Sequence, residues 1–203
     1  EDSCSAISNN FKIPEFQLKS LKSVSGNTNK STRPVVKVYD TIKDIDPKVW
    51  NKTFSEEGTL NYENIELVED IFSGSIISSD CWKFFYVQVL DGNTVRLQSI
   101  ITVALTKDDM LSPEHISEEV ENKRKELGDD YLTTKTLITG TLVTKGNHLF
   151  IDYENANWRN GLEVFMETLN SISDEYDCGK VLIRDFSGEP NSELTKLMLE
   201  LGF

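Results

Sequence analysis

Cysteine and histidine are the residue types most often used for nucleophilic catalysis and zinc binding, and both are scarce in this sequence. Three cysteines, Cys4, Cys81 and Cys178, lie far apart and form no Cys-x-x-Cys pair. The two histidines, His115 and His148, belong to no cluster with the spacing of metal ligands. The pattern therefore predicts neither a metal site nor a disulfide framework. We interpret the thiols and imidazoles as core or surface groups.

The chain is acidic, with 34 Asp and Glu against 21 Lys and Arg and a formal charge of -13. This charge repels the phosphates of nucleic acids and anionic lipids wherever no basic patch offsets it. No run approaches the roughly 18 apolar residues of a membrane-spanning helix, and residues 1–20 lack a signal-peptide pattern. We therefore expect a cytoplasmic protein that binds neither nucleic acid nor membranes. An anionic cofactor is compatible with this charge, because helix N-termini bind phosphate through backbone amides.

Composition divides the chain near residue 33. Residues 1–33 are rich in Ser, Asn, Thr and Lys and keep no long apolar period, which is typical of a flexible arm. Residues 34–203 are expected to form one domain, and its abrupt apolar end at Phe203 suggests a fragment of a longer protein. A short strand over 35–39 precedes a helix that begins after Asp46-Pro47 and ends near Phe54.

The middle of the chain contains helix caps and turn signals. Asn61 is expected to cap a second helix, and two β-branched or aromatic runs, 82–90 and 94–106, flank Asp91-Gly92-Asn93 and predict an antiparallel hairpin. A second hairpin is expected from 136–144 and 148–151 around Lys145-Gly146-Asn147. The apolar residues of the second helix that should face a core are Ile65, Val68, Ile71 and Phe72.

A helical insertion is predicted after Ser112-Pro113, with one apolar face and one solvated charged face. The apolar face holds Ile116, Val120 and Leu127. The charged face holds Glu118, Glu119, Glu121, Lys123 and Arg124.

The last third reads as an amphipathic helix over 158–172, a buried strand over 180–186 and a closing helix that ends at Gly202. The complete order is strand, two helices, antiparallel strands with a helical insertion, helix, strand and helix. This order predicts an α/β (α+β) fold with a mixed, mainly antiparallel sheet flanked by helices.

Both the order of elements and the ending of the chain resemble the Gcn5-related N-acetyltransferase (GNAT) superfamily. In that superfamily an Asn opens the last helix and Leu-Gly-Phe closes it, as Asn191 and Leu201-Gly202-Phe203 do here. Met198 occupies the position of the usual tyrosine, which is thought to protonate the departing coenzyme A thiolate. The resemblance implies a GNAT-like domain without the last strands, since the superfamily normally adds two strands after this helix.

The resemblance also implies that acetyl-CoA or another acyl-CoA binds at the start of the helix over 158–172. GNAT proteins have a loop of the form Arg/Gln-x-x-Gly-x-Gly/Ala there, which brings backbone amides close to the pyrophosphate. Gly161 is the one glycine retained. If it takes the first glycine position, Trp158 takes the basic position and Glu163 the second glycine position. If it takes the second glycine position, Arg159 takes the first and Ala156 the basic position. The alternative is an ordinary helix cap beside a surface arginine. The implied cofactor-binding residues are Asn157, Arg159, Asn160, Gly161 and Asn191.

The implied activity is an N-acyltransferase in which an amine of a small molecule or peptide attacks a thioester, with Asp152 or Glu154 as base. Both carboxylates could instead stabilise a helix start. Met198 carries no exchangeable proton, so water or another side chain, such as Tyr153 or Tyr176, would have to replace the usual tyrosine. One alternative is a catalytically silent GNAT-like module that binds a protein partner or regulates an attached enzyme. Another is a relative that takes aminoacyl groups from transfer RNA, which the acidic charge disfavours.

Overall fold

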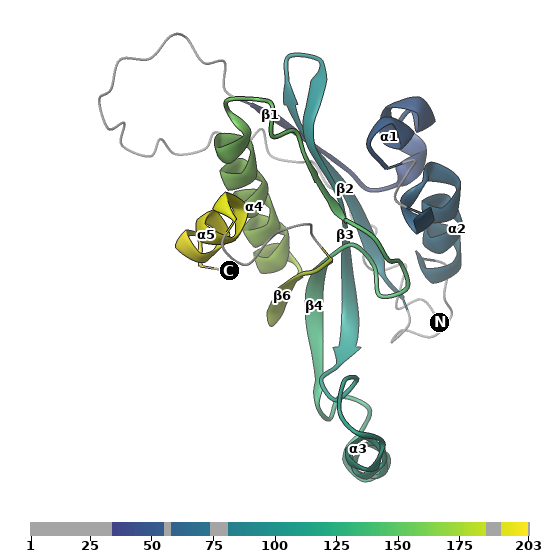
Figure 1. Cartoon of the computed structure of the whole chain (residues 1–203). Helices are drawn as coiled ribbons and strands as arrows, with labels where there is room; N and C mark the ends of the chain where they lie inside the picture. Colours follow the sequence, from purple (N-terminus) through teal and green to yellow (C-terminus); the bar gives the residue numbers. More distant parts are fainter. Residues whose placement is uncertain (1–33, 55–57, 74–80, 186–191, 203) are drawn as a thin grey trace. The chain divides into compact units, whose positions relative to one another are not determined.

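A computed structural model describes residues 34–54, 58–73, 81–185 and 192–202. These residues form a mixed six-stranded sheet with helices on both faces (Figure 1). The strand order is β1-β2-β3-β4-β6, and β5 pairs with β3. The one parallel pair is β4 with β6, and all others are antiparallel. The predicted mixed, mainly antiparallel sheet flanked by helices is confirmed. The arm predicted over residues 1–33 lies outside the described residues.

The strands have the following bounds: β1 Val35–Tyr39, β2 Lys83–Asp91, β3 Thr94–Lys107, β4 Thr133–Thr139, β5 Leu149–Ile151 and β6 Lys180–Ile183. The α-helices are α1 Pro47–Phe54, α2 Tyr62–Ser73, α3 Glu114–Leu127, α4 Trp158–Glu175 and α5 Glu193–Glu200. Two short 3-10 helices are η2 Ile42–Asp44 and η3 Gly58–Leu60.

The centre of the sheet is the β2–β3 hairpin, which the sequence predicted. Asp91 pairs with Thr94, so Gly92 and Asn93 form the turn, and Gly92 has the positive φ of 60° that such turns need. Side chains alternate between the two faces of a strand, and in β2 both faces are buried. The hairpin is therefore a central layer and not a half-exposed ribbon.

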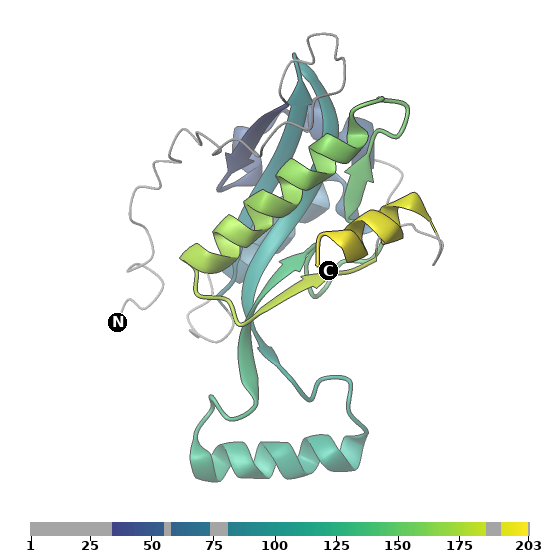
Figure 2. The same ribbon diagram turned by 90° about the vertical axis from the view of Figure 1, so that its left-hand side faces the viewer.

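Each face of the hairpin has its own apolar core. Helices α4 and α5 cover one face, and α1 and α2 cover the other (Figure 2). Phe85 and Val87 of β2 pack towards α4, whereas Phe84 and Tyr86 pack towards α1 and α2. The predicted amphipathic helix is confirmed as α4. Its buried residues are Gly161, Leu162, Val164, Phe165, Met166, Leu169, Ile172 and Ser173.

Helix α2 is capped by Asn61 as predicted, since the Asn61 side chain accepts from the Asn64 amide at 2.9 Å. Ile65 is fully buried, but Ile71 is 55% exposed, so the prediction that Ile71 faces a core is wrong. A helix turns about 100° per residue, which places Ile71 about 240° from Ile65 and Glu69 within about 40° of it. Glu69 therefore faces the core in its place.

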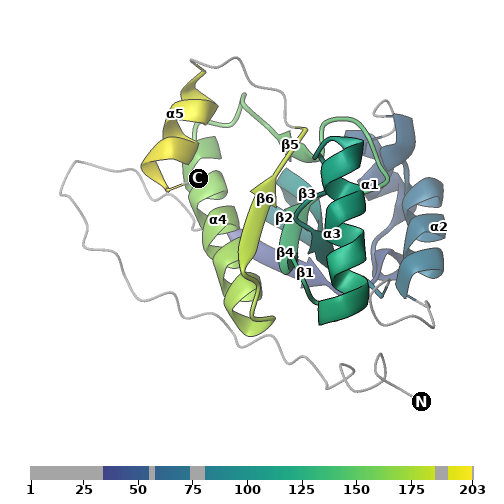
Figure 3. The same ribbon diagram turned by 90° about the horizontal axis from the view of Figure 1, so that it is seen from below.

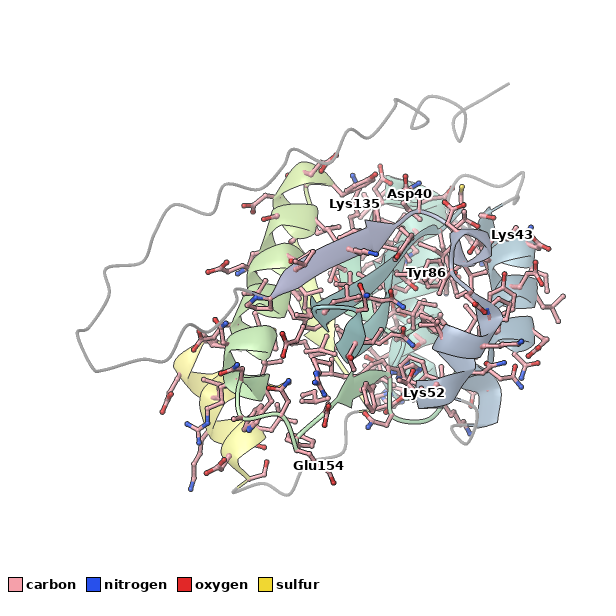
Figure 4. All side chains as sticks on the ribbon, turned by 90° about the horizontal axis from the view of Figure 1, so that it is seen from above. Asp40, Lys43, Lys52, Tyr86, Lys135 and Glu154 are labelled. Atoms are coloured by element: carbon pink, nitrogen blue, oxygen red, sulfur yellow. The ribbon has the colours of Figure 1, made fainter. Side chains whose placement is uncertain are left out.

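Glu69 is a buried carboxylate that receives three hydrogen bonds. Its Oε2 accepts from the Tyr86 hydroxyl at 2.6 Å and from the Ile42 amide at 2.8 Å, and its Oε1 accepts from the Thr41 hydroxyl at 2.5 Å. Burial, followed by the negative charge of Glu69, raises the pKa of Tyr86 far above its ordinary value. Tyr86 lies between the sheet and helices α1 and α2 (Figure 4). The network fixes α2 to the β2 strand and to the turn before η2.

Replacing Tyr86 with phenylalanine should lower the free energy of unfolding by about 1–3 kcal/mol, because a buried carboxylate oxygen loses a donor. Chemical denaturation of both proteins measures the difference. Tyr153→Phe is the matched control, since Tyr153 is half exposed and its hydroxyl can bond to water. The control should change stability by less than about 0.5 kcal/mol. Equal effects of the two variants would contradict a role for the Tyr86–Glu69 bond.

The predicted second hairpin does not form. Strands β4 and β5 do not pair with each other, and both are antiparallel partners of β3. Ile101 of β3 lies opposite Thr139, whereas Ser99 lies opposite Leu149. Residues 140–148 therefore leave the sheet as an excursion between two strands that continue one another. The residues Lys145-Gly146-Asn147 therefore lie within this excursion and do not form the turn of a hairpin.

The insertion is helix α3 as predicted, but its orientation differs. Arg124, placed on the solvated face by the sequence, is only 4% exposed and faces the strands, whereas Leu127 is 66% exposed. The Arg124 guanidinium donates to Asp109 at 2.5 Å, to Glu121 at 2.8 Å and to the carbonyl oxygens of Tyr131 and Leu132. These acceptors turn the polar side of α3 inward.

Cys81 is disulfide-bonded in the structure, and Cys178 is a free thiol. The sequence predicted no disulfide framework, and it gave no signal for a bond at Cys81 either. Wide cysteine spacing cannot reveal which thiols the fold brings together.

Candidate functional site

Asp152, one of the two predicted bases, follows β5 directly. Its Oδ2 accepts from Nη1 of Arg96 at 2.6 Å, and its Oδ1 accepts from the Glu154 amide at 3.2 Å. The carboxylate thus closes the turn that leads into α4 and neutralises a neighbouring cation. Both of its oxygens are engaged in the structure, which leaves Asp152 poorly placed to take a proton from a substrate.

Glu154, the other predicted base, is exposed on the loop that precedes α4 (Figure 4). Its amide belongs to the Asp152 turn. The structure therefore brings the two predicted bases onto one turn, as their spacing implied. The contacts of the Asp152 carboxylate with Arg96 and with the Glu154 amide give this residue a structural role in the turn.

The start of α4 holds four of the predicted cofactor-binding residues. Asn157 is the N-cap, yet its side chain makes no capping hydrogen bond. Arg159 forms an exposed ion pair with Glu193 at 3.0 Å and lies over the Trp158 ring at 5.5 Å. Asn160 is exposed. This turn presents backbone amides and one guanidinium to solvent, with a carboxylate of α5 beside them.

Gly161 is buried and faces the sheet. A Cβ built on it would lie 3.8 Å from Cγ1 of Val89 in β2, which is an ordinary van der Waals contact. Its position supports close packing of α4 on the sheet and not contact with a phosphate. Asn191, the fifth predicted residue, lies outside the described residues, and Ser192 caps α5 by accepting from the Thr195 amide at 3.2 Å.

Met198 is buried in the apolar core beneath α4 and α5. The two tyrosines considered as replacements lie near opposite ends of α4. Tyr153 packs edge-on against Trp158, and Tyr176 packs edge-on against Phe85. Burial raises the pKa of both hydroxyls. At most one of these tyrosines could serve a site at the start of α4.

A polar cluster that sequence reasoning missed lies at the excursion between β4 and β5. We call Thr141, Thr144, His148 and Asp185 the His148 cluster. The His148 ring is fully buried, with Nε2 2.8 Å from the Thr144 hydroxyl and Nδ1 3.8 Å from Oδ2 of Asp185. The Thr144 hydroxyl is also 2.9 Å from that of Thr141. A hydroxyl, an imidazole and a carboxylate thus follow one another in space.

Asp185 follows β6, which ends at Ile183. Parallel pairing of β4 with β6 runs from Thr136–Lys180 to Thr139–Ile183. Beyond it, the His148 amide donates to the Asp185 carbonyl at 3.3 Å, while β5 stays with β3. Asp185 has a φ of 51°, uncommon for a residue with a side chain.

The Asp185 carboxylate is 40% exposed, although it faces a buried ring. Its Oδ2 accepts from Arg184 Nε at 3.0 Å and Nη2 at 2.7 Å. The carboxylate therefore lies between solvent and the imidazole of His148, with 3.8 Å between Oδ2 and Nδ1, which is longer than a hydrogen bond.

Sequence alone could not have found this cluster, because Asp185 is 37 residues from His148 and only the β4–β6 pairing brings them together. The one local signal was a histidine four residues after a threonine.

Among the residues that the structure describes, no helix is both long and apolar enough to cross a bilayer, and no group of three or more His, Cys, Asp or Glu could hold a metal ion. Comparisons of the chain with protein-family models, with curated proteins and with solved structures found no match. The chain's own geometry therefore carries any functional conclusion.

Proposed function

We propose that this chain transfers an acyl group from an acyl-coenzyme A to an amine of a small molecule or peptide. The observation that carries the proposal is the parallel β4–β6 pair, beyond which the His148 amide donates to the Asp185 carbonyl within the His148 cluster. Helix α4 begins seven residues after β5 ends, and β6 and α5 follow it in the chain. This arrangement agrees with the strand-helix-strand-helix unit that the GNAT resemblance implies.

The start of α4 fits a pyrophosphate in two respects. The Asn157 side chain does not cap the helix, so the positive end of the dipole faces solvent, although the Asn157 and Trp158 amides already donate to Asn155. The Arg159–Glu193 pair is exposed on both sides, and such pairs contribute at most about 1 kcal/mol. Arg159 can therefore exchange Glu193 for a phosphate. Arg159 and the amides of the first turn are the groups proposed to hold the cofactor, which supplies an activated thioester.

Asp185 and His148 are proposed as the proton acceptor, in place of Asp152 and Glu154. The amine nitrogen forms a bond to the thioester carbonyl carbon, the bond from carbon to sulfur breaks, and the amine proton passes to the Asp185–His148 pair. The Asp185 carboxylate, 3.8 Å from Nδ1, would stabilise the charged ring electrostatically. Because Met198 is buried and carries no exchangeable proton, the departing thiolate takes its proton from water.

Titration calorimetry of the whole chain with acetyl-coenzyme A tests the proposal. Arg159→Ala should weaken binding about tenfold, because a charge-assisted contact to phosphate is lost. Lys48→Ala on α1 is the matched control and should leave the affinity unchanged, because Lys48 is an exposed cation on a helix that covers the opposite face. Absence of heat with a protein that unfolds cooperatively on heating would refute the proposal.

His148→Gln tests the proton acceptor. With acetyl-coenzyme A as donor and a lysine-containing tripeptide or a polyamine as acceptor, kcat should fall about 100-fold or more, while affinity for the donor stays within about threefold. Glutamine can still bond to Thr144 but cannot take up a proton near neutral pH. Asp152→Asn is the comparison variant and should retain most of the activity. The reverse order of the two variants would restore Asp152 as the base.

A second candidate function is a catalytically silent module that binds a partner protein or regulates an attached enzyme. Two observations favour it. Met198 lies in the core where the superfamily has a proton donor, and carboxylates already pair with Arg96 and Arg159 at the presumed site. A folded protein that binds no acetyl-coenzyme A would support this candidate.

The cytoplasmic location stays a prediction. The disulfide at Cys81 weighs against it, because disulfides persist mainly in oxidising compartments. Alkylation of the native protein before and after reduction, followed by mass spectrometry of the Cys81 peptide, would decide whether this thiol is blocked.

A further inference from the structure

Helix α3 is carried beyond the sheet by a two-stranded ribbon. β2 pairs with β3 only as far as Val103, and β6 pairs with β4 only from Thr136 onwards. Residues 105–107 of β3 and 133–135 of β4 therefore pair as strands only with each other, and one further bond reaches them from the Gly179 amide to the Lys135 carbonyl at 2.9 Å. Figure 2 shows α3 across the far end of this ribbon, away from α1, α2, α4 and α5, and Figure 3 looks at α3 from that end. We call residues 105–132 the α3 arm.

The arm turns polar groups inward and apolar groups outward. The side of α3 that faces the ribbon holds Ser117, Val120, Glu121 and Arg124. This inner side is therefore mainly polar, and its Arg124 forms ion pairs with Glu121 and Asp109. Leu111 is 96% exposed. Of the fourteen large hydrophobic side chains exposed among the described residues, six belong to the arm, which concentrates uncovered apolar surface there. They are Leu105, Met110, Leu111, Ile116, Leu127 and Leu132.

The same arm carries an excess of negative charge. It contains nine acidic and four basic side chains. Three of the acidic side chains form ion pairs: Asp108 with Lys180, Asp109 with Arg124, and Glu121 with Lys107. The other six carboxylates are exposed and form no ion pair with any residue in the described part of the chain. They are Glu114, Glu118, Glu119, Glu126, Asp129 and Asp130.

We propose that the α3 arm is a docking surface for a cationic amphipathic segment of another protein. Apolar side chains of such a segment would cover the exposed leucines and Met110, and its Lys or Arg residues would pair with the carboxylates around them. A second copy of the chain fits less well, because it would bring the same negative charge to the contact. Anionic lipids and nucleic acids are repelled for the same reason. The inference is independent of acyl transfer.

The test uses a short synthetic helix with leucines on one face and lysines on the other, labelled for fluorescence anisotropy. Binding to the whole chain should be saturable. Leu111→Ser with Leu127→Ser should weaken it at least about tenfold, since two apolar contacts with the peptide are lost. The matched control is Leu67→Ser with Ile71→Ser, which removes two exposed apolar residues from α2, a helix that also exposes carboxylates. The control should change affinity less than about threefold.

Each other result overturns the proposal. Equal weakening by the two double variants would mean that the peptide binds exposed apolar side chains of α2 as readily as those of the arm. Absence of saturable binding would remove the docking surface. Sedimentation showing a dimer that Leu111→Ser with Leu127→Ser dissociates would assign the arm to self-association. Affinity for acetyl-coenzyme A, measured on the same variants, should not change, so this test and the acyltransferase test fail separately.

Discussion

Replacement of Gly140 with alanine should lower the free energy of unfolding by about 2–5 kcal/mol, because two penalties add at this position. Gly140 has a φ of 93°, which side chains rarely adopt, and a Cβ built on it would lie 2.5 Å from two carbons of the His148 ring. The glycine cannot move away easily. Its amide donates to the Ile100 carbonyl at 2.7 Å, and its carbonyl accepts from the Thr102 hydroxyl at 2.7 Å. Thermal and chemical denaturation measure the loss.

Gly128→Ala separates the two penalties. Gly128 has a φ of 112°, but a Cβ there would have no atom within 4 Å, so only the backbone penalty of about 1–2 kcal/mol applies. A second comparison is Gly140→Ala combined with His148→Ala, which should recover the part of the loss caused by the ring. Equal destabilisation by the two single glycine variants would mean that the His148 ring does not lie against Gly140.

Replacement of Arg124 with methionine should loosen the α3 arm while the sheet stays folded. The variant leaves the Asp109 carboxylate and the carbonyl oxygens of Tyr131 and Leu132 without their guanidinium donor. Loss of several charge-assisted hydrogen bonds should speed amide hydrogen exchange in α3 roughly tenfold or more. Exchange in β2 and α4 should stay close to that of the unmodified chain, because those elements belong to the main core.

Arg159→Met is the control for this variant, since its ion pair with Glu193 is exposed on both sides and should contribute little. The effect of Arg124→Met should also depend on pH. The hydrogen bond from Arg124 holds the pKa of Asp109 below its ordinary value, so this stabilisation is present above the unfolded pKa of about 3.9. It is lost as the pH falls through the lower folded pKa, and the two proteins should then converge. A constant difference down to strongly acid pH would contradict the pairing.

The two variants examine different parts of the molecule. Gly140 supports the His148 cluster, where acyl transfer is proposed, and Arg124 supports the arm, where partner binding is proposed. A chain with a disordered arm and unchanged affinity for acetyl-coenzyme A would show that the two regions work independently. Loss of both activities in Arg124→Met would instead indicate that the arm stabilises the sheet.

The sequence by itself determined the elements whose signals are local. The turn at Gly92, the cap at Asn61 and the apolar period of α4 each depend on residues within a few positions of one another, and all three stand in the structure. The mixed sheet followed from the order of these elements. Asn157, Arg159 and Asn160 lie on one exposed turn because they are neighbours in the chain, whereas Gly161 faces the sheet.

Only the tertiary structure decided the features that depend on distant partners. Arg124 faces inward because its guanidinium donates to Asp109 and to the carbonyl oxygens of Tyr131 and Leu132. The helical period of α3 cannot predict acceptors that lie outside the helix. Residues 140–148 leave the sheet because β3 pairs with β4 and then with β5, a choice of partner that the turn residues do not encode. His148 meets Asp185 through the β4–β6 pairing alone. Local periodicity fixes what an element is, whereas hydrogen bonds between distant segments fix which side chains it brings together.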